Sequence, residues 1–186
     1  LLFFIFGGAI VGETVALSIV VSASGLATLS KLYIINGLLL LGLPLLFFRY
    51  IDKFKRENLL ADQLLVSAAL LVSYLFAFNA RGIVSPAVAQ GMLMIIYPVS
   101  YLSKTVNFLT FWTLANDVSN SGEAKKGFPV IAAWGFLGGL LGSFVAWAML
   151  RVVDAQTLIW LWMVLYLVAW VLVKRVRHTF WDQLLR

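Results

Sequence analysis

The chain contains no cysteine and a single histidine, His178, among its 186 residues. Without cysteine, a disulfide framework, a thiolate metal site and a catalytic thiol are excluded within this chain. One histidine cannot build a multi-histidine metal or haem site, so we expect neither a metal nor a cofactor. No Ser/His/Asp set or pair of carboxylates suited to catalysis stands out either. We therefore expect a protein that is not an enzyme.

Charged residues are scarce, at 12% of the chain, whereas 62% are hydrophobic and the mean hydropathy is +0.98. A composition of this kind is typical of an integral membrane protein rather than of a water-soluble domain. Long uninterrupted apolar runs favour helices, because the strands of a membrane barrel alternate in polarity and lipid cannot satisfy exposed backbone groups. The sequence therefore predicts an all-α integral membrane fold.

Hydropathy along the chain predicts six membrane-spanning helices, since about 20 apolar residues cross the hydrocarbon. The predicted spans are 1–21, 32–48, 59–78, 88–118, 129–150 and 157–173. Together they form a six-helix bundle over residues 1–174, followed by a juxtamembrane tail, 175–186. The first span lacks the basic region and small-residue cleavage site of a signal peptide.

Basic residues predict the orientation of this bundle. The links after the second, fourth and sixth spans hold most of them: Arg49, Lys53, Lys55, Arg56, Lys125, Lys126, Lys174, Arg175, Arg177 and Arg186. The opposite links hold only Lys31, Arg81 and Arg151. By the positive-inside rule both ends of the chain are cytoplasmic. Topology and anionic lipid headgroups thus explain the net charge of +6, and we expect no nucleic-acid partner.

Two halves of the bundle, about 1–78 and 84–174, begin on opposite sides of the membrane, as a three-plus-three inverted repeat requires. The second span is followed by RYID (49–52), and its counterpart, the fifth span, by RVVD (151–154). A cation often follows a helix C-terminus because the helix dipole favours it, so coincidence is the alternative reading of this echo.

The most distinctive segment is 111–143. It contains Phe111-Trp112, then Ala115-Asn116-Asp117, then Glu123-Ala124-Lys125-Lys126, then Pro129 and a series of glycines. This order resembles the bacterial and plastid ATP/ADP translocase family, a distant branch of the major facilitator superfamily. Segments 22–34 and 49–60 are similar to that family's short outer loop and basic inner loop.

The resemblance implies the first half of a twelve-span transporter in the bacterial cytoplasmic membrane. Such a protein moves a nucleotide or other organic anion by alternating access and needs a second six-helix half as its partner. Ser100 departs from the family pattern, in which an acidic residue often lies near this position. The alternative is a non-transporting six-helix subunit or anchor, which packs against membrane lipids and other membrane subunits.

Ionisable residues within membrane spans are functional candidates by default. Glu13 lies in the middle of the first span, and the fourth span carries a polar stripe on one helical face. The stripe consists of Ser100, Ser103, Lys104, Asn107 and Thr110. Lys104 would offer an anion a positive charge. Our candidates for the substrate path are Glu13, Ser100, Lys104, Asn107 and Asn116. The alternative is that Lys104 only neutralises Glu13, or that the stripe is a seam between helices.

Asp117, Glu123 and Lys125 belong to a polar link between the fourth and fifth spans. One reading makes them a cytoplasmic gate that pairs with nearby basic residues, including the Arg49–Arg56 cluster. In the other reading, Ser121 caps the fifth helix and Glu123 lies in its first turn, where the helix dipole favours a carboxylate.

Glycines four residues apart predict close helix packing. The candidates are Gly8 and Gly12 in the first span and Gly135, Gly138, Gly139 and Gly142 in the fifth. We expect the fifth helix to meet the first or the third through this face. The tryptophans, including Trp160, Trp162, Trp170 and Trp181, are expected at membrane interfaces or facing lipid.

Overall fold

The computed structural model describes residues 1–51, 53–79, 85–119 and 121–184, and within them every regular element is a helix. The helices are α1 (Leu2–Ser24), α2 (Ala27–Ile51), α3 (Arg56–Asn79), α4 (Pro86–Val118), α5 (Ser121–Met149) and α6 (Ala155–Leu184). Each corresponds to one apolar segment of the sequence. The all-helical prediction is confirmed.

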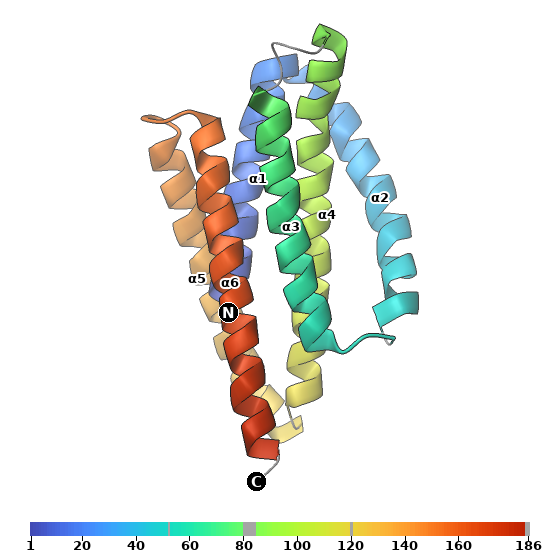
Figure 1. Ribbon diagram of the computed structural model, residues 1–186, viewed down its shortest axis with the longest axis vertical. Helices are drawn as coiled ribbons and strands as arrows, with labels where there is room; N and C mark the ends of the chain where they lie inside the picture. Colours follow the sequence, from blue (N-terminus) through green and yellow to red (C-terminus); the bar gives the residue numbers. More distant parts are fainter. Residues whose placement is uncertain (52, 80–84, 120, 185–186) are drawn as a thin grey trace.

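Successive helices run in opposite directions along the long axis of the molecule (Figure 1). Among the described residues, α1, α3, α5 and α6 each contain a segment long and apolar enough to cross a membrane. The corresponding segment of α2, Ala27–Gly42, is shorter. These four helices make the chain an integral membrane protein.

Several helices extend beyond the predicted spans, the fifth and the sixth among them. The fifth begins at Ser121, so Lys125 lies in its first turns rather than in a link between helices. The sixth continues without a break to Leu184, through the residues we expected to form a separate tail. Helical hydrogen bonding continues where apolar character ends, because Ala, Lys and Arg are all good helix formers.

The first helix is the centre of the bundle. It packs against α4, α5 and α6, while α4 also packs against α2 and α3, and α3 packs against α6. Residues from all around α1 are buried, among them Val11, Val15, Ala16 and Val20, none of which is exposed. A helix that is apolar on every side is suited to this central place.

Glycines bring α1 and α5 into backbone contact. A Cβ atom added at Gly138 would collide with the carbonyl group of Phe3, and one at Gly142 would lie 2.7 Å from the carbonyl oxygen of Gly7. In the other direction, a Cβ at Gly7 would lie 3.0 Å from the carbonyl oxygen of Gly138. Of the two neighbours expected for the fifth helix, the structure therefore selects the first. Gly135 and Gly139 share this face, against Leu2 and Phe6 respectively.

The next face of α1 receives two aromatic rings from α6. A Cβ at Gly8 would lie 3.0 Å from the ring of Tyr166, and one at Gly12 would overlap the indole of Trp162. Trp162 is only 2% exposed. The expectation of an interfacial or lipid-facing position is therefore wrong for this tryptophan, because glycine leaves room for a ring against the backbone of α1.

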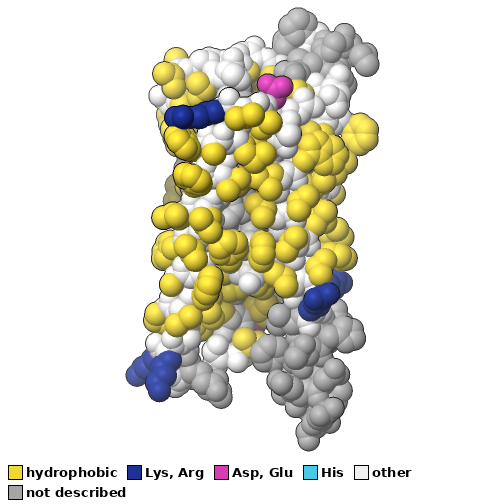
Figure 2. Space-filling model, turned by 90° about the vertical axis from the view of Figure 1, so that its left-hand side faces the viewer, with side chains coloured by type: hydrophobic (Ala, Val, Ile, Leu, Met, Phe, Trp, Pro, Cys, Tyr) yellow, Lys and Arg dark blue, Asp and Glu magenta, His cyan; other side chains and the backbone are white. Residues whose placement is uncertain are grey.

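Hydrophobic side chains cover the middle of the face shown in Figure 2, and charged side chains lie toward its two ends. The described basic residues other than Lys104 also lie toward the two ends of the bundle. At the end where α2 and α4 finish are Arg49, Lys53, Lys55, Arg56, Lys125, Lys126, Lys174 and Arg175. Lys31 and Arg151 lie near the opposite end.

Candidate functional site

Glu13 and Lys104 form an ion pair between the middle of α1 and the middle of α4. The Lys104 Nζ donates to the Glu13 Oε2 at 2.5 Å, and the side chains are 22% and 27% exposed, respectively. The pairing of Lys104 with Glu13 is thus observed, as one of the alternatives for Lys104 expected. Both remain partly accessible, so the pair is not sealed within the bundle.

Three tyrosines surround this pair and connect it with α2. The Lys104 Nζ lies 4.7 Å from the centroid of the Tyr101 ring, a cation–π distance. Tyr97 lies 6.4 Å from Tyr101 and makes an edge-to-face contact with Tyr33 of α2, with centroids 5.9 Å apart. Tyr33 is 55% exposed. A row of aromatic rings therefore runs from the ion pair to the outer surface of the bundle.

The polar stripe of α4 is divided between different neighbours. Ser100 and Thr110 are buried and donate to carbonyl oxygens of their own helix, at Tyr97 and Val106. Such bonds satisfy hydroxyls within a membrane helix without a partner from another helix. They leave Ser100 in the bundle interior, where it contributes no charge.

Ser103 and Asn107 instead connect α4 to α3. The Ser103 hydroxyl is 2.7 Å from that of Ser67, and Asn107 Nδ2 donates to Ser103 Oγ at 3.3 Å. Asn107 is 1% exposed. This half of the stripe is a seam between α3 and α4, whereas Lys104 pairs with Glu13 of α1.

An ion pair joins α3 and α4 at the basic end of the bundle. Arg56, the first residue of α3, donates from Nη1 to the carboxylate of Asp117, near the end of α4. Nearby, Asn116 and Lys125 are exposed. The side chain of Glu123 lies outside the described part of the structure. Of the proposed gate residues whose side chains the structure describes, Asp117 has a basic partner from the 49–56 cluster.

Trp112, in the aromatic pair Phe111-Trp112 that begins segment 111–143, packs where α4 meets α5. Trp112 contacts Phe128 of α5 edge-to-face, with centroids 5.4 Å apart, and also contacts Phe108 at 6.0 Å. Phe108 in turn lies 5.8 Å from Phe6 of α1. These rings give Trp112 a role in helix packing.

Sequence reasoning missed three features of the site. It did not identify Tyr101 as a neighbour of Lys104 or Ser67 as the partner of Ser103. It also missed Asn36 of α2, which is 4% exposed and whose amide atoms have no hydrogen-bond partner among the described residues. Tyr101 lies three residues before Lys104, a helical spacing that was available from the sequence.

The arrangement suits an anion better than a metal. A lysine and a carboxylate that face each other offer one cation and one exchangeable counter-ion, and within the described residues no cluster of three acidic or histidine side chains is placed to hold a metal. Comparisons with family models, curated proteins and solved structures give no match for this chain.

Proposed function

We propose that all six helices cross the membrane and form one half of a facilitator-like carrier for an organic anion. The four helices with clear membrane-spanning segments, α1, α3, α5 and α6, form with α2 and α4 a series in which each helix runs opposite to the one before it. If α2 or α4 did not cross the membrane, every link after it would lie on the opposite side from the one proposed. The concentration of basic residues at one end of the bundle supports this alternation and, by the positive-inside rule, supports a cytoplasmic position for that end.

Helix packing supports an inverted repeat made of α1–α3 and α4–α6. The first helix packs against α5 and α6 of the other half, and its counterpart α4 packs against α2 and α3. The remaining principal contacts, α1 with α4 and α3 with α6, join equivalent helices. A two-fold axis in the membrane plane would produce this pattern, in which the first helix of each half packs against the other two helices of the opposite half.

The ion pair of Glu13 with Lys104 is the observation that carries the proposal. A charge pair in the middle of two membrane helices is costly to bury, and a partly accessible one is available to exchange partners. In the proposed mechanism, a carboxylate or phosphate group of the substrate takes the place of Glu13 beside Lys104.

The alternative function is that of a membrane subunit which transports nothing. One observation favours it: the two charges already satisfy each other at 2.5 Å and need no substrate. Exposed aromatic residues of α5, including Trp134 and Phe136, would then contact lipid or other subunits. We favour transport because the pair is partly accessible, so that an anionic group can reach Lys104.

Uptake by the full-length protein in proteoliposomes tests the proposal. Labelled nucleotides and smaller phosphate compounds are offered outside, with and without a proton gradient. Since hydrogen bonds to charged groups are worth about 1.5–3 kcal/mol, Lys104→Ala should reduce uptake at least about tenfold. The matched control is Lys31→Ala, an exposed lysine at the outer end of the bundle. Absence of uptake by the native protein for every anion offered would favour the subunit.

A further inference from the structure

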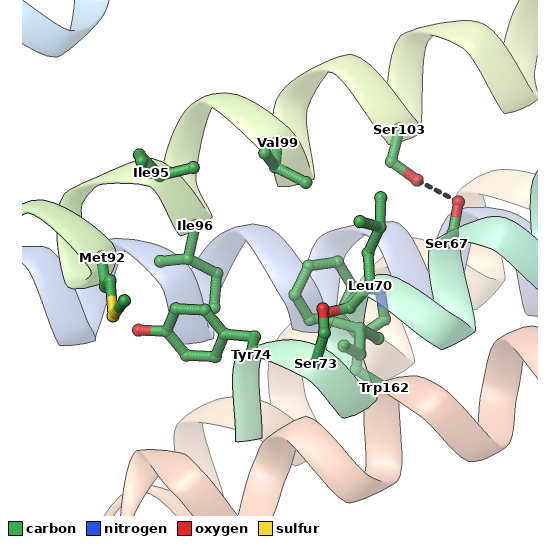
Figure 3. A pocket seen from close by; sticks show the side chains of 11 residues that line it. Ser67, Leu70, Ser73, Tyr74, Met92, Ile95, Ile96, Val99, Ser103 and Trp162 are labelled. Atoms are coloured by element: carbon green, nitrogen blue, oxygen red, sulfur yellow. Dashed lines mark hydrogen bonds between the residues drawn. The ribbon is translucent and has the colours of Figure 1, made fainter. Parts of the chain in front are cut away.

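A cavity of about 210 Å³ lies between α3, α4 and α6 (Figure 3). Its inner end carries the hydrogen-bonded hydroxyls of Ser67 and Ser103, and Trp162 forms part of its wall. Leu70 and Ile95 also line it and are 47% and 61% exposed, so the cavity opens between α3 and α4. The opening lies within membrane helices and is apolar.

Trp162, which lines this cavity, and its neighbour Tyr166 each carry a buried donor without a well-formed hydrogen bond. Trp162 is 2% exposed and Tyr166 is fully buried, yet neither the indole Nε1 nor the phenol oxygen makes a hydrogen bond among the described residues. Their rings are 6.0 Å apart, and the Tyr166 hydroxyl faces Trp162, Ser103 and Asn107, none of which bonds to it with normal hydrogen-bond geometry. Buried donors are normally satisfied, and an unsatisfied pair points to a missing acceptor.

We propose that this cavity binds a neutral lipophilic molecule with one ring, a carbonyl oxygen on the ring and an alkyl tail. The chemistry is that of a membrane quinone, and the inference is independent of transport.

Three observations define this ligand. No charged residue lines the cavity, so a neutral molecule is favoured over a fatty acid or phosphate. The volume exceeds the roughly 150 Å³ of an engineered cavity that binds benzene, so one substituted ring fits. The buried donors call for an acceptor at the inner end, while the apolar opening lets a tail extend into lipid.

Thermal unfolding of the full-length protein in detergent tests this proposal. The probes are a decyl-substituted benzoquinone and decylbenzene, which has the same tail but no acceptor. We expect the quinone to raise the unfolding temperature saturably, with half-saturation at a concentration about tenfold lower than for decylbenzene. Equal effects of the two probes, or no effect of either because water or packing fills the space, would overturn the proposal.

Two variants locate the binding. Val99→Trp fills the cavity and should abolish the quinone effect, whereas Val88→Trp, on the exposed surface of the same helix, should retain it. Trp162→Phe removes the N–H and should bring the preference for the quinone to within about twofold. Retention of the full quinone effect in Val99→Trp would place the ligand elsewhere, even if Trp162→Phe fails to fold.

Discussion

Gly138 lies where the backbones of α1 and α5 come into contact, against the carbonyl group of Phe3. Even the methyl group of alanine would collide there, so Gly138→Ala should destabilise the folded protein by about 1–3 kcal/mol, and Gly138→Leu by more. Thermal unfolding in detergent provides the measurement. The control is Gly91→Ala in α4, where an added Cβ has open space. An unchanged unfolding temperature for Gly138→Ala would mean that α5 does not approach α1 in this way.

Glu13 and Lys104 should depend on each other for stability. Lys104→Ala leaves a carboxylate without its partner, and we expect a loss below the about 3–5 kcal/mol typical of fully buried pairs, because both groups are partly exposed. Adding Glu13→Gln should restore most of that loss. A double-mutant cycle from unfolding in detergent measures this coupling, expected to be at least about 1 kcal/mol. Additive effects would show that the two residues act independently.

At the residue scale, the sequence identified the charged pair but did not identify the buried tryptophan. Glu13 and Lys104 stand out in the sequence because ionisable residues are rare at membrane depth. Trp162 does not stand out in this way, because a tryptophan in an apolar helix can either face lipid or pack inside the bundle. Only the position of Gly12 on the neighbouring helix decides between these places, and that contact joins residues 150 apart in the chain.

The helices α3 and α4 are joined at their basic ends by Arg56 and Asp117. Because Asp117 is 45% exposed, Arg56→Ala should lower the free energy of unfolding by less than about 1 kcal/mol and only at low salt. The clearer effect of Arg56→Ala should be local, as faster amide hydrogen exchange in the last turn of α4. Lys125→Ala, at the same end, serves as the control. A loss of several kcal/mol would mean that the pair is shielded from water.

At the element scale, long apolar runs were sufficient to predict six helices, but not where they end. The fifth helix begins at Ser121 and the sixth reaches Leu184, since neither charge nor a drop in hydropathy stops helical hydrogen bonding. Hydropathy marks the part of a helix that lipid surrounds. Helix ends depend on capping and turn residues, which were less distinct here.

At the scale of the whole molecule, the glycine pattern predicted close contact for the fifth helix and left its neighbour open between the first and the third. The central place of α1 depends on which faces meet in three dimensions, and its apolar sequence on all sides does not distinguish burial in protein from burial in lipid. The packing of α1 against α5 and α6, and of α4 against α2 and α3, likewise came from the structure alone.

Six crossings with a basic cytoplasmic side form the basis of the transport proposal, and α2 and α4 are the helices that most need a test. Single cysteines are placed at Lys31 and Lys55, before and after α2, and at Ser85 and Lys125, before and after α4; the native chain has none. A membrane-impermeant thiol reagent added outside intact cells should label Lys31→Cys and Ser85→Cys. Lys55→Cys and Lys125→Cys should react only after the membrane is opened. Labelling of Lys31→Cys and Lys55→Cys from the same side, or of Ser85→Cys and Lys125→Cys from the same side, would contradict the six-span account.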